Sequence, residues 1–248
     1  MTLVKLTTVA VLALALGACQ SLFQPNMRTP LEVKRDRWEH IQPGCSTADC
    51  PLVNIDTIHF PANPKLDAIV EKRLLQMTQD NERTPLPSSL KAYEDQFMAT
   101  AQTRNSSYLQ AKVREQHDGL VIIELSSYLD TGGAHGMPGR GFINYSRQQD
   151  KVLTLQDMLI PGQEATFWKT AEESHKAWLI STGMDKDAEF VKTWPFRQTP
   201  HIALTYGAVI LKYEVYAIAP YSMGHIELKI PYPRLNGVIK PELFPGRG

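Results

Sequence analysis

The sequence carries no net charge, because its 26 basic and 26 acidic residues cancel. Runs of like charge do not extend beyond a few residues. A nucleic-acid-binding protein needs a basic surface, since lysine and arginine must replace the counterions around the phosphates. The balance therefore excludes nucleic acid as a partner. Internal repeats and low-complexity segments are also missing, and the length suits one large domain or two small ones.

The motifs that mark common catalytic and cofactor sites do not occur either. The sequence contains no GxSxG, no HxxxH and no HxxEH. The glycine-rich stretch GGAHGMPGRG lacks the lysine and the helix that follow a phosphate-binding loop. We therefore expect no metal, no cofactor and no enzymatic activity.

Cysteine is scarce, with three residues in the whole chain. Cys45 and Cys50 lie five positions apart in GCSTADC, where they would form a small disulfide loop in an oxidising compartment. Chain entropy gives so short a loop only about 2 kcal/mol. The alternative is a metal site, but His40 and His59 are the only other soft ligands nearby. We predict the disulfide.

The N-terminus MTLVKLTTVAVLALALGACQS has one lysine, an apolar stretch and then small residues. This pattern predicts a secretory signal, since the apolar stretch is too short to span a membrane. Leu16–Cys19 resembles the lipobox of bacterial lipoproteins, which implies removal of residues 1–18 and a diacylglycerol on Cys19. The alternative is an ordinary signal peptide. Gln20 and Ser21 follow the cysteine without an aspartate, and resemblance to enterobacterial sorting then implies the outer membrane, facing the periplasm.

Residues 19–44 are polar and interrupted by three prolines, so we interpret them as a tether that holds the folded part away from the membrane. The folded domain is expected over residues 45–243, with a tail over 244–248. Hydrophobic periodicity and turn residues divide this domain into strands and helices. The expected strands cover residues 53–60, 106–116, 119–129, a hairpin with its tip at 148–151, and two or three more within 201–232. The expected helices follow Asn63 and Ser88 or Ser89, then cover 163–182 and 185–193.

Helices grouped between runs of antiparallel strands are typical of an α+β fold, with antiparallel sheets and helices packed on one face. Three turns are well marked in the sequence. Asp118-Gly119 is a strong hairpin signal, Gly183 is a suitable end for the long helix, and Tyr206-Gly207 separates two late strands.

His135 in TGGAHG is the most tempting candidate for chemistry. Gly132 and Gly133 could expose its imidazole as an acid–base or metal-binding group. The alternative is a tight turn in which both glycines supply positive φ angles. Asp130 and His225 are possible partners of the imidazole, but the sequence does not place them near it. We favour the turn.

Tyrosine is concentrated between residues 213 and 232, at positions 213, 216, 221 and 232. Tyrosine is common in recognition surfaces, but strands favour it anyway. Arg140 ends the glycine-rich loop and is free to engage a partner. The predicted ligand-binding residues are Gly132, Gly133, His135, Arg140, Tyr216 and Tyr221.

Three segments in a fixed order, SSYLDTGGAHG, LTLQDML and YEVYAIAPYSMGHIELKIPY, resemble the RsiV-like domain family. The resemblance covers about residues 50–240. It implies a bacterial extracytoplasmic module of largely unknown function, which in the anti-sigma factor RsiV binds lysozyme. Similar modules precede the catalytic domain of the peptidoglycan deacetylase PdaC. The spanning helix and sigma-binding segment of RsiV have no counterpart here, so the anti-sigma role does not transfer, and we expect no room for a deacetylase domain.

The sequence thus favours a non-enzymatic, lipid-anchored envelope protein that binds a lysozyme-like muramidase or peptidoglycan. Two other hypotheses stay open. One is a cell-wall hydrolase with His135 as its acid–base group, and the other is a structural component of the envelope.

Overall fold

The structure is a computed structural model that describes residues 27, 29–79 and 84–246. The expected signal peptide over residues 1–18 and the expected lipidation site Cys19 lie outside the described residues. Within the described ranges, no helix combines the length and the apolar character needed to cross a bilayer.

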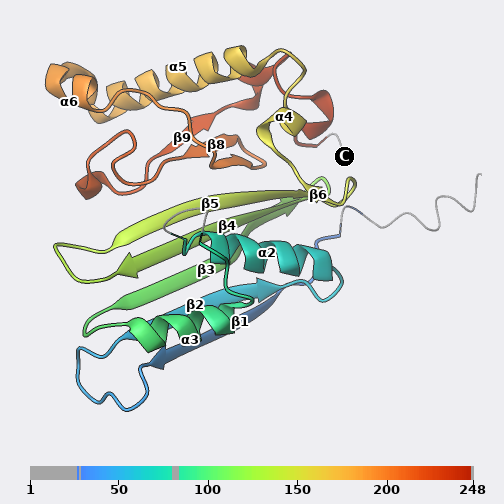
Figure 1. The fold of residues 1–248 in the computed structure, drawn as a ribbon. Coiled ribbons are helices and arrows are strands. Elements are labelled where there is room, and N and C mark those ends of the chain that lie inside the picture. The colour runs from blue at the N-terminus through green and yellow to red at the C-terminus, as the bar shows by residue number, and fades with distance from the viewer. Residues whose placement is uncertain (1–26, 28, 80–83, 247–248) are drawn as a thin grey trace, which may run out of the picture.

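Six strands form the larger of two sheets and lie in the order of the chain (Figure 1). They are β1 (Lys34–Ile41), β2 (Leu52–His59), β3 (Ser106–His117), β4 (Leu120–Asp130), β5 (Met137–Ser146) and β6 (Lys151–Val152). All neighbours are antiparallel except β2 and β3, which are parallel. The α+β class is confirmed. The sequence predicts antiparallel sheets, and the pair β2–β3 differs from that prediction. Two helices in the β2–β3 connection allow the chain to cross over.

Those two helices, α2 (Pro64–Gln76) and α3 (Leu90–Thr100), lie on one face of the large sheet (Figure 1). Asn63 begins α2, because its side chain accepts a hydrogen bond from the Leu66 N–H at 3.0 Å. Ser89 begins α3 in the same way, through the Ala92 N–H. Both helix starts are those that the sequence predicts.

The predicted tether is wrong in its second half. Residues 34–41 are the edge strand β1, which pairs with β2 along its whole length. This strand lacks the alternation of apolar and polar residues that marks a strand in a sequence, because almost all of its side chains face solvent. Arg35 holds it to the sheet through two hydrogen bonds to Asp56, and Trp38 donates to Glu94 at 2.7 Å. Cys45 and Cys50 form the predicted disulfide in the loop after β1.

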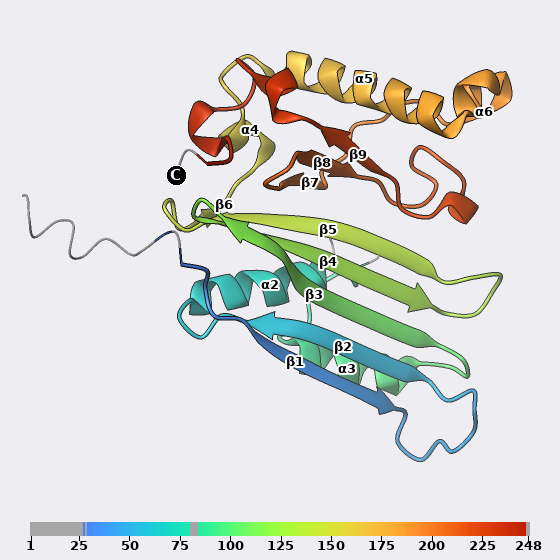
Figure 2. The same cartoon turned by 180° about the vertical axis from the view of Figure 1, so that it is seen from behind.

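The second sheet is antiparallel and consists of β7 (Ile202–Leu204), β8 (Val209–Lys212) and β9 (Glu227–Ile230). It lies between the large sheet and the long helix α5, as the view from behind shows most clearly (Figure 2). The helices of this half are α4 (Leu155–Met158), α5 (Glu164–Thr182) and α6 (Ala188–Thr193). Short 3₁₀ turns are η1 (Met184–Lys186), η2 (Tyr221–Met223), η3 (Tyr232–Leu235) and η4 (Pro241–Leu243). Gly183 ends α5 at φ 75°, as predicted.

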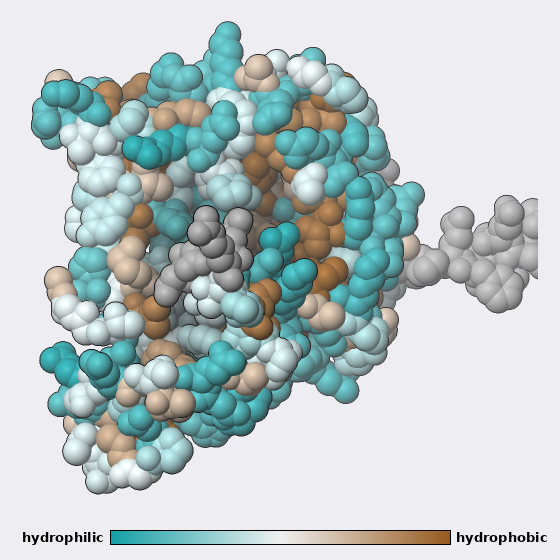
Figure 3. Space-filling view, viewed as in Figure 1, coloured by the Kyte–Doolittle hydropathy of each residue, from teal (hydrophilic) through white to brown (hydrophobic). Residues whose placement is uncertain are grey.

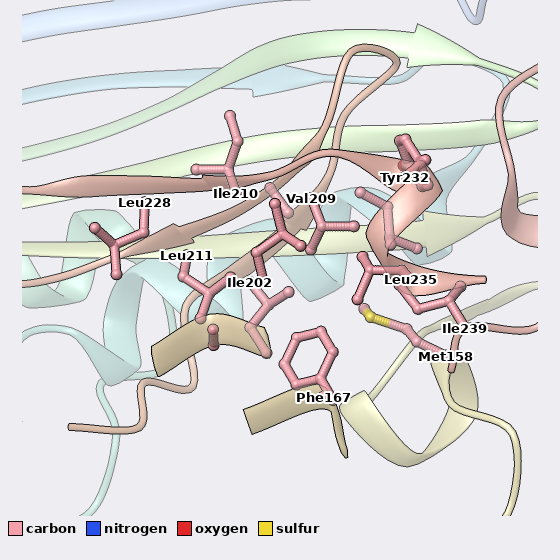
Figure 4. Close-up of a cluster of buried hydrophobic side chains, with 14 of the residues drawn as sticks. Met158, Phe167, Ile202, Val209, Ile210, Leu211, Leu228, Tyr232, Leu235 and Ile239 are labelled. Carbon is pink, nitrogen blue, oxygen red and sulfur yellow. The ribbon is translucent and has the colours of Figure 1, made fainter. Parts of the chain in front are cut away.

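Two hydrophobic cores share strand β4, whose side chains alternate between them. The helix-side core includes Val121, Ile123 and Leu125 of β4, packed with α2 and α3. The small-sheet core includes Leu120 and Ile122 of β4, packed with α5 and the second sheet, and Figure 4 shows part of it. Strands point successive side chains to opposite faces, so one strand forms a wall of both cores.

The C-terminal segment contributes to the small-sheet core as well. Phe244 packs against this core with its ring 5.5 Å from that of Tyr232, and the Gly246 N–H donates to Asp118. The expected tail over residues 244–248 is therefore wrong at its start, because Phe244 supplies a ring that the core covers.

Candidate functional site

Four aromatic side chains gather at one end of the two sheets, and we call them the aromatic cluster: His135, Trp194, Tyr216 and Tyr221. His135 comes from the β4–β5 loop, Trp194 follows α6, and both tyrosines lie between β8 and β9. The His135 ring stacks on Tyr221 with centroids 3.9 Å apart. Trp194 stacks on Tyr216 at 6.4 Å. The fold thus joins the two segments in which the sequence placed its predicted binding residues, 81 positions apart.

The β4–β5 loop owes its shape to its glycines. Gly132 and Gly133 adopt φ angles of 87° and 126°, which side chains larger than glycine rarely take. The Asp130 carboxylate fixes the turn by accepting the Gly132 N–H at 2.9 Å. Both glycines are exposed, and a Cβ at either position would meet no atom within 4 Å, so the positive φ angles of the turn are what require glycine here.

Gly136 connects this loop to the rest of the cluster. Its carbonyl accepts hydrogen bonds from the Tyr221 hydroxyl at 3.1 Å and from His135 Nδ1 at 3.0 Å. Its own N–H donates to the Tyr128 hydroxyl, and a Cβ here would lie 2.4 Å from the Tyr128 ring. Only glycine fits beside that ring, so this position fixes where the imidazole stands.

Hydrogen-bond contacts engage both nitrogens of the His135 ring. A carbonyl oxygen can only accept, so Nδ1 carries the proton that it shares with Gly136. Nε2 lies 3.1 Å from the Tyr216 hydroxyl, which can donate or accept. Both ring nitrogens are thus engaged in contacts that position the imidazole.

Tyr216 adopts an unusual backbone conformation. Its φ of 64° lies in the left-handed region, which costs a non-glycine residue about 1–2 kcal/mol. Its side chain is nevertheless 47% exposed, so burial of the ring does not repay this strain. Strained residues gather at functional sites when the surrounding structure holds them. Sequence reasoning could not detect this feature.

The partners suggested for a catalytic His135 are engaged elsewhere. Asp130 bonds the loop backbone, and His225 Nδ1 contacts the Tyr213 carbonyl at 3.2 Å. Burial lowers the pKa of His225, which therefore stays neutral more readily than an exposed histidine. Across the described ranges, no group of three His, Cys, Asp or Glu side chains could hold a metal ion.

The four tyrosines of the late segment divide into two pairs. Tyr213 and Tyr232 are buried, and their hydroxyls donate to the carbonyls of Arg197 and Thr205 at 2.8 Å. Burial raises the pKa of each of these two phenols. Tyr216 and Tyr221 instead belong to the surface cluster. Trp194 is the cluster member that sequence reasoning missed, because it precedes a proline in a polar stretch without a pattern of its own.

Arg140 does not join the aromatic cluster. Its backbone N–H donates to Glu214 Oε1 at 3.3 Å, and its guanidinium Nη1 donates to the Gly139 carbonyl. Burial lowers the pKa of Arg140, while the more distant carboxylates of Glu124 and Glu214 oppose that shift. Its side chain lines a separate groove.

This groove, which we call the β5 groove, is a cavity of about 670 Å³ between α2 and the second half of the chain. Its apolar lining includes Met77, Phe142, Leu155 and Trp168. The described lining residues include the cationic side chains of Arg73 and Arg140 and no aspartate or glutamate. Figure 3 shows apolar residues between α2 and α4 on this face, bordered by hydrophilic ones.

A buried ionic network lies between the two sheets. Arg114 Nη1 donates to Glu124 at 2.9 Å and contacts Glu227 at 3.1 Å, and Lys212 bonds both carboxylates. Burial would raise the pKa of Glu124, but the hydrogen bonds from Lys212 and Arg114 prevail and hold it at about 2. The network joins the two sheets electrostatically.

The comparisons with known proteins agree on one family. Residues 156–233 match the family DUF3298, described as a protein of unknown function. A solved DUF3298 family protein from Pseudomonas aeruginosa PAO1 is 68% identical, with a TM-score of 0.86, covering 90% of this chain and 100% of its own. A solved member from Bacteroides fragilis NCTC 9343 is 17% identical, with a TM-score of 0.65, covering 86% and 94%, and it shows the fold alone. No curated protein matches. The chain belongs to the DUF3298 family.

Proposed function

We propose that this protein is a non-enzymatic binding protein of the bacterial cell envelope, and that the aromatic cluster binds the glycan of peptidoglycan. The observation that carries the proposal is the cluster itself. Four aromatic rings from three segments stand at the surface, and hydrogen bonds to one backbone carbonyl hold two of them.

The chemistry of the cluster suits a sugar. Aromatic rings offer an apolar face to the C–H face of a pyranose, while tyrosine hydroxyls and the imidazole offer polar edges for its hydroxyl groups. The ring of Tyr216 is 47% exposed and therefore accessible. Rigid aromatic side chains lose little conformational entropy on binding, which favours them as anchors.

The envelope location is part of the same proposal and rests on the sequence. The lipobox-like Leu16–Cys19 and the disulfide between Cys45 and Cys50 both suit an extracytoplasmic protein. The resemblance to the RsiV-like family adds a second ligand, a lysozyme-like muramidase, which must be tested beside the glycan. Anchoring through a lipid on Cys19, in the outer membrane, would keep the module near the wall.

The test is calorimetric titration of the purified protein with soluble muropeptides and, separately, with a chicken-type lysozyme. We expect muropeptide binding that Trp194→Ala weakens about tenfold, the usual loss when an anchoring aromatic residue is removed. Tyr206→Ala is the matched control, because Tyr206 is 57% exposed but stands outside the cluster. Binding of lysozyme without binding of muropeptides would identify a muramidase, and not the glycan, as the ligand. Silence with both ligands would refute the proposal, and turnover of muropeptides would make the protein an enzyme.

A further inference from the structure

Strand β5 has a free edge in the β5 groove. β4 pairs with it from Met137 to Ser146 on one side. On the other side β6 reaches only Tyr145 and Ser146. No other described strand pairs with residues 137–144 of β5 on that side. This stretch of β5 therefore has no backbone-paired strand on that side among the described residues, although the Asn144 side chain bonds the Ile202 carbonyl of β7.

Two hydrogen bonds show which backbone groups of β5 face the groove. The Arg140 N–H bonds Glu214, and the Asn144 carbonyl accepts from the Leu153 N–H at 2.8 Å. Both groups point away from β4. In an antiparallel strand, alternate residues direct their N–H and C=O to the same side, and the register here is continuous. Phe142 lies two residues from both Arg140 and Asn144, so its N–H and C=O face the groove as well.

The groove keeps this edge accessible and gives it a charge preference. Free edges are usually blocked by proline, by charge or by a covering element. Here the Glu214 carboxylate, which accepts the Arg140 N–H, limits the free stretch at one end, and the bonded Asn144 carbonyl limits it at the other. Between them lie the Phe142 backbone groups, with Trp168 on the opposing wall. Arg73 and Arg140 have no carboxylate within ion-pair distance among the described residues.

We propose that the β5 groove binds an extended segment of a partner protein that carries an acidic side chain. The segment adds as a strand to β5, with backbone hydrogen bonds to Phe142 and its carboxylate at Arg73 or Arg140. Strand addition supplies affinity through the backbone, and pockets beside the edge select alternate side chains. Because the free stretch is short, the arginines and the apolar walls must supply the selectivity.

The first experiment uses blocked peptides of about seven residues, which is an ordinary strand length. The probe alternates valine and threonine around a central glutamate, and two matched probes carry lysine or glutamine instead. NMR titration of the full chain reads the Phe142 amide and the Trp168 indole. We expect the glutamate probe to bind most tightly, with slower exchange of the Phe142 amide hydrogen.

One variant isolates the charge, and a pair of variants isolates the backbone contact. Arg73→Gln, on an exposed helix face, should weaken the glutamate probe about threefold and leave the glutamine probe unchanged. Phe142→Ala removes the ring but keeps the N–H, whereas Phe142→Pro removes both. Proline is tolerated at an edge position whose N–H faces outward. Binding retained in the alanine variant and lost in the proline variant, both folded by circular dichroism, would support strand addition.

The opposite results are equally clear. Equal binding of the three probes would overturn the acidic preference, and shifts confined to the aromatic cluster would place the peptide elsewhere. No binding of any probe would refute the inference. Trp194→Ala should leave peptide binding unchanged, so this inference and the proposed glycan site can fail independently.

Discussion

The two faces of strand β4 are built differently. Toward α2 and α3 the strand presents only apolar residues up to Leu125, and they join a core of ordinary hydrophobic packing. Toward the second sheet it presents Leu120 and Ile122, and then Glu124, which is 4% exposed and bonded to Lys212 and Arg114. On its helix side β4 contributes only packing, and the polar contacts of that half lie farther off, at Asp56 and Glu94. On its other side β4 itself carries a buried charge that links the two sheets.

Both candidate binding surfaces lie where these two halves meet. The aromatic cluster combines the β4–β5 loop of the first half with Trp194 and two tyrosines of the second. The β5 groove likewise lies between α2 of the first half and Trp168 of the second. Both surfaces exist only while the halves are docked. Polar contacts demand a specific geometry, so they can define that docking more narrowly than apolar packing does.

The largest effect is expected in the helix-side core. Ile123 is fully buried, and Ile123→Ala should lower the free energy of unfolding by about 3 kcal/mol through lost transfer energy and a cavity. Chemical denaturation measures this. Val191→Ala, on exposed α6, is the control and should change it by less than about 0.5 kcal/mol. Since β4 belongs to both cores, one unfolding transition is expected, and two transitions would show that the two halves unfold independently.

Glu124→Gln tests the polar face of the same strand. It should cost about 2 kcal/mol near neutral pH, because Lys212 and Arg114 lose a buried carboxylate but keep Glu227. The pKa of Glu124 is held at about 2 instead of 4.5, so its contribution is present above about pH 4.5. That contribution is lost as the pH falls toward 2. The difference between wild type and variant should shrink over this window, and Glu172→Gln on the surface of α5 is the control.

Asn144 is another polar link between the halves, and its removal should have a smaller and more local effect. Its buried side chain donates to the Ile202 carbonyl at 2.7 Å and accepts the Leu204 N–H at 2.8 Å. Asn144→Leu would leave both groups unpaired, at a cost of about 1–2 kcal/mol. Hydrogen exchange should accelerate at the Leu204 amide and stay slow in β2 and β3. Uniform acceleration would show that the two halves do not separate locally.

The sequence predicts the local features of this fold well. Asn63 and Gly183 mark the helix ends they were expected to mark, and Asp118-Gly119 forms the β3–β4 turn with both φ angles positive. These features depend on residues within one turn of each other, and capping and glycine geometry act at that range. The strand β1 was missed because an exposed edge strand needs no apolar alternation.

Long-range contacts account for the rest of what sequence reasoning missed. The charge network joins Glu124 to Lys212 across 88 positions, and neither residue stands in a motif. His135 and Tyr216 were both named as candidates, but their contact and the place of Trp194 beside them depend on the docking of the two halves. Arg140, also named, points into the groove instead. Side-chain type can nominate a residue, whereas the topology decides which residues meet.

The smallest effect on stability is expected at Tyr216. Substitutions there distinguish the cost of the left-handed backbone from the stabilisation that the ring provides. Tyr216→Gly removes a left-handed strain of about 1 kcal/mol and an exposed ring, so the two changes should nearly cancel in the melting temperature. Muropeptide binding should nevertheless fall about as far as in Trp194→Ala. Tyr216→Phe keeps the ring and the strain but removes the hydroxyl that bonds His135 Nε2, and should weaken binding less. A clear loss of stability in the glycine variant would instead make the cluster a structural part of the fold, because a ring held only for a ligand contributes little to the free protein.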